Sequence, residues 1–268
     1  MIRLLENATG RMGLIRRARG FSNEINPERG FFDVMVDRYG LSLDIFEGSL
    51  DLIPREGPLI CVANHPYGIL DGLMMCHILS RCRRDFRIMA HSVFDRAPEI
   101  AAHLLPISFD ANAAALQLNL QTRQNARHYL GSGGAVGIFP GGTVSTGARP
   151  FSRPLDPGWR SFTARMIARS DAQVVPIYFD GQTSRIFQLA SHLHSTLRVG
   201  LLMSEFRARV DTPVRVAIGK PIGRDQLGPL AADSKSMMDF LRKATYDLAP
   251  EPVGASELGF EFEEHHRA

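Results

Sequence analysis

Short apolar runs alternate with segments of helical periodicity along most of the chain. The short runs have the length and apolar character of buried strands in a parallel sheet. They cover residues 58–64, 86–93, 135–140, 174–181 and 213–222. Segments with helical spacing of apolar residues cover residues 31–40, 72–82, 97–105, 113–130 and 234–249. Strands that alternate with helices indicate a single α/β domain, with a mostly parallel sheet flanked by helices.

Residues 41–54 follow a different pattern. Apolar and polar residues alternate there around Glu47-Gly48, which predicts a β-hairpin. No internal repeat or low-complexity segment is visible. We therefore expect one domain over residues 31–250, with a distinct segment on either side of it.

Composition narrows the class of protein. With 268 residues and 44% hydrophobic content, the chain is long enough to bury a substantial core. The cysteines Cys61, Cys76 and Cys82 are odd in number and lack metal-ligand spacing, so we expect reduced thiols and no metal site. No run approaches the ~18 apolar residues of a membrane-spanning helix. These features favour a protein that is soluble or bound peripherally to the cytoplasmic face of a membrane.

The net charge of +3 conceals an uneven distribution. Residues 1–20 contain five arginines against one glutamate, and residues 251–268 contain five glutamates against one arginine. A second basic patch consists of Arg81, Arg83, Arg84 and Arg87. Ends of opposite charge predict a charged partner, either nucleic acid or anionic lipid. No nucleic-acid recognition motif accompanies the arginines, which favours the lipid.

The N-terminal segment, residues 1–30, reads as a basic amphipathic helix. Apolar residues recur at helical spacing at Met1, Leu5, Ala8, Met12 and Ile15. Such a helix can lie on an anionic membrane surface with its apolar face down. The alternative is a surface helix that packs the same stripe on the protein's own core. Residues 251–268 are predicted to form an acidic tail.

The stretch CVANHPYGILDG, residues 61–72, contains the candidate chemistry. His65 directly follows a predicted strand and Asp71 lies six positions later. Histidine suits base catalysis near neutral pH, and a carboxylate on its second nitrogen would orient the ring. Spacing alone is weak, because nine histidines make one such match expected by chance. Pro66 and Gly68 permit the turn that the pair requires, and an ordinary strand-to-helix loop is the alternative.

Two later blocks follow in order: IFPGGTVST at residues 138–146 and VVPIYFDGQTSRIF at residues 174–187. Together with the first block, they resemble the glycerolipid acyltransferase superfamily, which includes the lysophosphatidic acid acyltransferases. The resemblance covers roughly residues 40–222. It implies a PlsC-like acyltransferase with His65 as general base and Asp71 as its orienting carboxylate. It further implies substrate-binding roles for Asn64, Gly141, Gly142 and Thr143.

The sequence departs from the superfamily pattern at two places. Five residues separate His65 from Asp71, whereas the commonest form has four. This form, and SRIFQLASHLHSTLR at residues 184–198, resemble a hemolysin-like bacterial branch that includes O-acyltransferases completing ornithine lipids. In addition, Val144 stands where the superfamily has a phosphate-binding arginine, and valine cannot donate a hydrogen bond to a phosphate.

These departures predict a lyso-aminolipid acceptor, in which an amino acid or sulfonated amine is N-linked to a 3-hydroxy fatty acid. Its anionic head group needs a cation, and the candidates are Arg149, Arg153, Arg160 and Arg185. Arg185 is included in the predicted site. The acyl donor would be an acyl-carrier-protein or coenzyme A thioester, with no cofactor. The basic patch at residues 81–87 could bind the acidic carrier protein or simply be solvated.

The sequence is also compatible with other functions. A 1-acylglycerol-3-phosphate acyltransferase could bind its phosphate through an arginine outside the usual block. A catalytically silent lipid-binding protein could retain the fold, and a thioesterase or lipase could use water as acceptor. The chain has no Gly-x-Ser-x-Gly motif, which favours direct attack by the acceptor hydroxyl over an acyl-enzyme.

Overall fold

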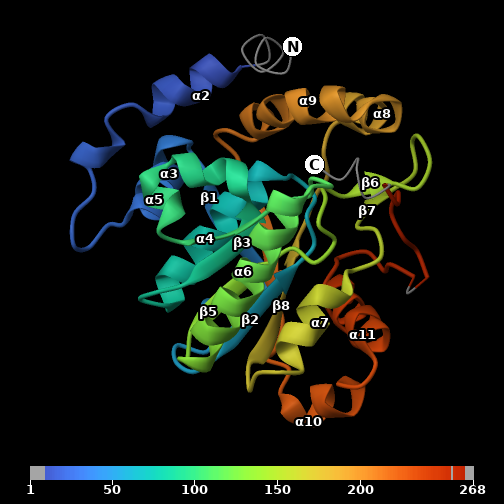
Figure 1. The fold of residues 1–268 in the computed structure, drawn as a ribbon. Coiled ribbons are helices and arrows are strands. Elements are labelled where there is room, and N and C mark those ends of the chain that lie inside the picture. Colours follow the sequence, from blue (N-terminus) through green and yellow to red (C-terminus); the bar gives the residue numbers. More distant parts are fainter. Residues whose placement is uncertain (1–9, 255, 263–268) are drawn as a thin grey trace.

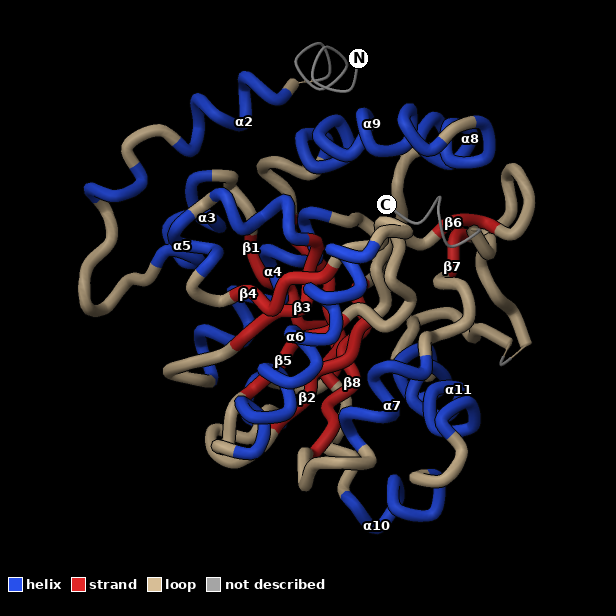
Figure 2. The backbone as a smooth tube through the Cα atoms, viewed as in Figure 1, coloured by secondary structure: helices blue, strands red, loops and turns tan. Residues whose placement is uncertain are grey.

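A computed structural model describes residues 10–254 and 256–262 of the chain, and its central sheet lies between two layers of helices (Figure 1). The strands, red in Figure 2, are β1 Ser42–Glu47, β2 Leu59–Ala63, β3 Arg87–His91, β4 Leu104–Ile107, β5 Ala135–Ile138, β6 Thr146–Gly147, β7 Pro154–Leu155, β8 Gln173–Phe179 and β9 Pro213–Ile218. The helices are α2 Arg11–Ala18, α3 Phe31–Arg38, α4 Ile69–Cys82, α5 Pro98–Ala101, α6 Ala113–Gly131, α7 Ser161–Ile167, α8 Arg185–Leu193, α9 Ser195–Ala208, α10 Arg224–Leu227 and α11 Ser234–Tyr246.

Seven strands form the main sheet in the order β1-β9-β8-β2-β5-β3-β4. Every neighbouring pair is parallel except β8 and β9, which are antiparallel. The strands β6 and β7 form a separate antiparallel pair. The prediction of a single α/β domain with a mostly parallel sheet is therefore confirmed.

Strand β2 lies at the centre and is completely buried, because helices cover both faces of the sheet. Its residues Leu59, Cys61 and Ala63 pack in the core formed with α3, α4 and α9. Its residues Ile60 and Val62 pack in a second core formed with α6, α7 and α11. This two-sided burial explains why β2 reads as a continuous apolar run.

Two predicted elements were wrong. Residues 41–54 do not form a hairpin: β1 pairs in parallel with β9, so that Ser42 lies opposite Pro213. The alternation reflects a half-buried edge strand, whose partner comes from far along the chain. A 3-10 turn at Leu50–Leu52 follows. Within the predicted helix 97–105, only the four residues of α5 are helical. The last two residues, Leu104 and Leu105, belong instead to edge strand β4, which pairs with β3.

The described part of the N-terminal segment packs on the domain. Helix α2 lies beside α9 (Figure 1) and buries Leu14, whereas Met12 of the predicted stripe is exposed. Arg17 donates to Asp211, with Nη1 and Oδ1 2.8 Å apart. The first half of the predicted stripe, Met1 to Ala8, lies outside the described residues.

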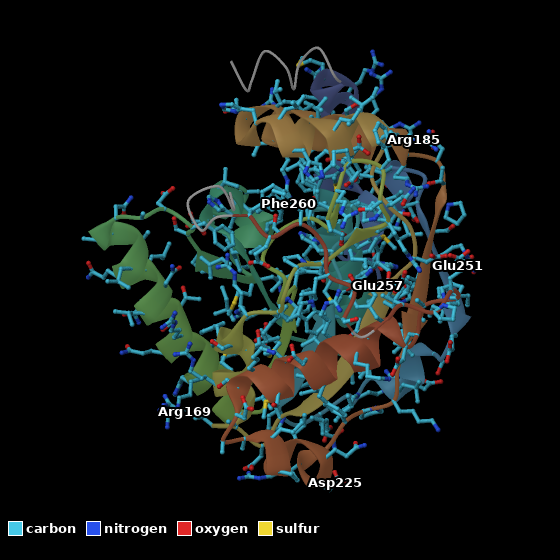
Figure 3. All side chains as sticks on the ribbon, turned by 90° about the vertical axis from the view of Figure 1, so that its right-hand side faces the viewer. Arg169, Arg185, Asp225, Glu251, Glu257 and Phe260 are labelled. Atoms are coloured by element: carbon cyan, nitrogen blue, oxygen red, sulfur yellow. The ribbon has the colours of Figure 1, made fainter. Side chains whose placement is uncertain are left out.

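The C-terminal segment also contacts the domain. Figure 3 shows Glu257 and Phe260 on a stretch that crosses the body of the molecule. The amide of Gly259 donates to the carbonyl of Asp156 at 2.9 Å, and that of Phe260 donates to Thr146 at 2.9 Å. Residues 256–262 are thus packed on the domain, while the histidines His265 and His266 lie outside the described residues.

Candidate active site

Apart from Arg185, the predicted site residues meet at one edge of the sheet. The adjacent parallel strands β8, β2 and β5 end there. They are followed by Asp180, by Asn64-His65 and by Phe139-Pro140-Gly141. In α/β sheets, ligands bind outside the carboxyl ends of the strands. The topology therefore brings together blocks that are about 75 residues apart in the sequence.

His65 and Asp71 are in direct contact. Nδ1 of His65 lies 3.0 Å from Oδ2 of Asp71. Oδ2 also accepts the amides of Tyr67 at 2.8 Å and Gly68 at 2.9 Å, because Asp71 is the third residue of α4 and caps its first turn. Gly68 has φ +77°, a conformation that returns the chain on itself between the two residues. The turn that the sequence only permitted is present.

Burial and hydrogen bonding act in opposite directions on this carboxyl group. Asp71 has no exposed surface, and burial raises its pKa above the usual value, while His65 and the two amides oppose that rise. Three donors around one oxygen favour the carboxylate form. The His65 ring stacks on Phe139, with centroids 4.2 Å apart. Its side chain remains 19% exposed, and because Nδ1 faces Asp71, Nε2 on the other side of the ring is the nitrogen left for a substrate.

Asp156 fixes the backbone of His65 and was missed by sequence reasoning. Its Oδ1 accepts the amide of His65 at 3.2 Å and the hydroxyl of Ser145 at 2.5 Å. Its Oδ2 accepts the indole N–H of Trp159 at 2.9 Å. The amide of Ser145 in turn donates to the carbonyl of His65 at 2.8 Å. The one signal in the sequence was an isolated carboxylate between Leu155 and Pro157.

Asn64 joins the ends of two strands. Its Nδ2 donates to the carbonyl of Phe179 at 2.9 Å, and its Oδ1 accepts the amide of Phe179 at 2.7 Å. The side chain is buried and both of its polar atoms are bonded within the protein. Asn64 therefore positions the loop that carries His65.

The glycine block after β5 lies against the same loop. The amide of Gly142 donates to the carbonyl of Phe139 at 3.0 Å, so it is not available to a substrate. The amides of Gly141 and Thr143 meet no acceptor among the described residues. Val144 is buried, and its methyl group lies 3.0 Å from the place where a Cβ on Gly68 would stand. The block thus offers backbone donors and an apolar wall, with no cation of its own.

A cation reaches this block from a different element. Arg198 of α9 is 2% exposed, and its Nη2 donates to Oγ1 of Thr143 at 2.6 Å and to the carbonyl of Val144 at 2.8 Å. Arg185, the predicted residue, is instead exposed at the start of α8, at the periphery of the molecule (Figure 3). Helical spacing on α9 gave no sign of a buried arginine, so sequence reasoning missed it.

The other candidate arginines take different places. Arg149 and Arg153 are exposed, and Arg153 donates to the carbonyls of Pro252 and Glu251. Arg160 is half-buried beside Gly142, with its guanidinium over the ring of Phe109. Of the four, Arg160 alone lies against the glycine block.

The proposed carrier-protein patch is not intact. Arg83 is buried and donates to the carbonyls of Pro54, Gly57 and Gly133, so it stabilises loops at the opposite ends of the strands. Its place in a docking surface was therefore wrong. Only three arginines of the patch remain exposed or half-buried.

Cysteine and histidine side chains outside the site also have structural positions. Cys61 is fully buried in β2, and burial raises the pKa of its thiol far above the usual value. His77 contacts Asp33 at 3.2 Å between α4 and α3, and burial lowers its pKa. Within the described ranges, no cluster of three or more potential ligands could bind a metal ion.

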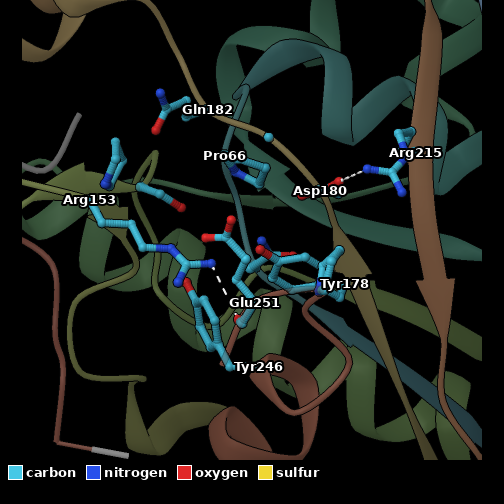
Figure 4. Close-up of a pocket in the computed structure, with 13 residues that line it drawn as sticks. Pro66, Arg153, Tyr178, Asp180, Gln182, Arg215, Tyr246 and Glu251 are labelled. Carbon is cyan, nitrogen blue, oxygen red and sulfur yellow. Dashed lines mark hydrogen bonds and ion pairs between the residues drawn. The ribbon is translucent and has the colours of Figure 1, made fainter. Parts of the chain in front are cut away.

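A cavity of about 310 Å³ adjoins the site (Figure 4). Asn64 and Pro66 form one wall, and Tyr178 and Tyr246 lie among the other lining residues. His65 and Asp71 are not among the residues that line it. The cavity therefore lies behind the His65–Asp71 loop rather than at the His65 ring.

The Acyltransferase family matches residues 47–180, which include the whole His65–Asp71 loop and the glycine block. None of the curated proteins matches the chain. Among solved structures, the chain is similar to the 1-acyl-sn-glycerophosphate (LPA) acyltransferase PlsC from Thermotoga maritima, with a TM-score of 0.43 and 15% identity over 79% of this chain and 81% of that chain. Since the family match covers half of the sequence, the chain belongs to the Acyltransferase family and is an acyltransferase.

Proposed function

We propose that this enzyme transfers a fatty acyl chain from a thioester to the free 3-hydroxyl of a lyso-aminolipid, in membrane lipid biosynthesis. The observation that carries the proposal is the His65–Asp71 pair, with Nδ1 and Oδ2 3.0 Å apart and Nε2 open to a substrate. The donor is an acyl-carrier-protein or coenzyme A thioester, and no cofactor takes part.

The pair supports direct attack by the acceptor. Nε2 of His65 removes the hydroxyl proton as that oxygen bonds to the thioester carbonyl carbon. Asp71 accepts a hydrogen bond from Nδ1–H and stabilises the imidazolium that forms. The carbonyl oxygen becomes an oxyanion, which the unpaired amides of Gly141 and Thr143 can stabilise. Collapse then breaks the carbon–sulfur bond, and the leaving thiolate takes the proton from His65.

The buried Val144 supports an acceptor other than lysophosphatidic acid. A phosphate monoester is bound best by a bidentate guanidinium, and the block itself provides only an isopropyl group and backbone. A singly charged carboxylate or sulfonate needs less positive charge in the site than a phosphate monoester does. Lysophosphatidic acid remains the second candidate, because Arg198 reaches the block from outside it.

We also propose that the enzyme binds the cytoplasmic face of the inner membrane through an anionic lipid surface. Large apolar side chains are exposed on α8 and on the turn between β6 and β7: Phe151 is 75%, Ile186 70% and Leu193 76% exposed. Arg149 and Arg185 flank them. Helices α2, α8 and α9 lie along one side of the molecule (Figure 1), and no described helix is long and apolar enough to cross a bilayer.

Mass spectrometry of acyl transfer tests the proposed function. Acyl-carrier-protein and coenzyme A thioesters are each offered with a lyso-ornithine lipid, an N-(3-hydroxyacyl)taurine or lysophosphatidic acid. We expect ester products from the first two acceptors. Ester formed from lysophosphatidic acid alone would retain the role of His65 and refute the acceptor assignment, and thioester hydrolysis without ester would indicate a hydrolase.

A further inference from the structure

A buried positive charge next to the glycine block has no counter-charge in the described part of the chain. Arg198 lies on α9, and its guanidinium is enclosed by the rings of Phe262 at 4.1 Å and Phe187 at 5.8 Å. It forms no ion pair with any described carboxylate, and its Nη1 is buried without a hydrogen-bond partner. Uncompensated burial lowers the pKa of this guanidinium to about 9. Buried charges are ordinarily paired, so this arrangement suits a ligand that brings an anion.

Arg198 lies close to the catalytic loop. Leu202, four residues later and therefore on the same face of α9, has a methyl group 3.0 Å from the place where a Cβ on Gly68 would stand. Gly68 donates its amide to Asp71. One helical turn, about 5.4 Å, thus separates Arg198 from a residue that packs on the His65–Asp71 turn.

The stacking of Phe262 does not block an anion. An aromatic ring covers the face of a guanidinium, whereas the N–H bonds point outward in its plane. Nη2 donates hydrogen bonds to Thr143 and Val144, and these bonds fix the orientation of the guanidinium plane. Nη1 is then the donor that remains for a carboxylate, sulfonate or phosphate oxygen.

We propose that Arg198 binds the anionic head group of the acyl acceptor, and so supplies from α9 the cation that Val144 does not supply from the block. This inference rests on the proposed function. The bound head group would place the acceptor with its anion at α9 and its hydroxyl toward His65. Its anion can be a carboxylate, a sulfonate or a phosphate, and the acceptors below distinguish these sources.

The test compares Arg198→Met with the matched control Arg169→Met. Arg169 is exposed at the end of the molecule opposite α9 (Figure 3). Both variants and the wild type are assayed with the lyso-ornithine lipid, its methyl ester (which lacks the carboxylate charge), the N-(3-hydroxyacyl)taurine and lysophosphatidic acid. Loss of one charge-assisted contact should raise KM for the acceptors that carry an anion about 10- to 100-fold. The methyl ester should show no rise in KM with Arg198→Met, and Arg169→Met should behave as wild type throughout.

The acceptor whose KM rises most with Arg198→Met identifies the anion bound. An equal loss of activity with the anion-bearing acceptors and with the methyl ester would show that Arg198 is only structural and would overturn the inference, as would an unchanged KM. If Arg198→Met fails to fold, Arg198→Lys is assayed in its place, together with the thermal unfolding of wild type. The lyso-ornithine lipid, added without an acyl donor, should then raise the unfolding temperature of wild type more than its methyl ester does. Absence of ester product with every acceptor would instead refute the proposed function, and the unfolding comparison would still decide the role of Arg198.

Discussion

The substitution Asp71→Asn separates the catalytic and structural roles of this carboxylate. Asparagine has the same shape, and its side-chain oxygen can still accept the amides of Tyr67 and Gly68. What is lost is the negative charge 3.0 Å from Nδ1 of His65. We therefore expect α4 to remain capped while the imidazolium formed during the reaction loses its stabilising partner.

The size of the effect follows from the geometry. Two unit charges 3.0 Å apart interact by about 5.5 kcal/mol at an effective dielectric constant of about 20. Partial exposure of His65 makes this an upper limit, so kcat should fall by about 10²- to 10⁴-fold. Stability should not fall. Burial raises the pKa of Asp71, so its charge destabilises the fold by an amount that grows as pH rises from the usual aspartate pKa to the raised one, and the neutral amide removes this cost.

The assay is single-turnover acyl transfer at saturating acceptor, with urea unfolding of the same preparations. Asp71→Ala provides the contrast, because it leaves two buried amides without an acceptor and should lower the free energy of unfolding by about 2–4 kcal/mol. A kcat of Asp71→Asn within threefold of wild type would refute the role of the charge. Equal losses of stability in both variants would refute the structural argument.

Three further predictions concern the loop, the thiol and the membrane. Asn64→Ala removes both bonds to Phe179 and should cost about 2–3 kcal/mol of unfolding free energy; a urea midpoint equal to wild type would contradict this. Cys61→Ala should leave kcat unchanged, and thiol reagents should not inactivate the native enzyme, because the Cys61 thiol is buried and protonated. Inactivation that parallels labelling of Cys61 would contradict this. Ile186→Ser with Leu193→Ser should reduce flotation with anionic vesicles at least tenfold, while retained flotation would move the membrane contact elsewhere.

The sequence was sufficient for the local features of this fold. Continuous apolar runs predicted β2, β5 and β8, because strands buried on both faces have few or no polar positions. Prediction from the sequence failed where pairing between distant segments decides the structure. The alternation at residues 41–54 fits both a hairpin and a half-buried edge strand, and only β9, about 170 residues later, distinguishes them.

In the candidate site, too, the local features could be predicted from the sequence and the long-range contacts could not. His65, Asp71 and their turn could be predicted, because the residues that form the turn lie between them in the sequence. Asp156 and Arg198 could not, since their roles arise from contacts with residues 91 and 55 positions away. Arg185 was included among the predicted binding residues, but the fold places it at the periphery, and the arginine that contacts the glycine block is Arg198.

The most direct test of the account compares wild type with His65→Ala, using the best acceptor of the panel and a labelled acyl thioester. Tandem mass spectrometry identifies the ester, and intact-protein mass spectrometry with donor alone detects any acyl-enzyme. We expect the 3-O-acyl product from wild type, none from His65→Ala, and no acylated protein in either sample. Ester formation by His65→Ala, or an acyl adduct on the wild-type chain, would contradict direct base-catalysed transfer through His65.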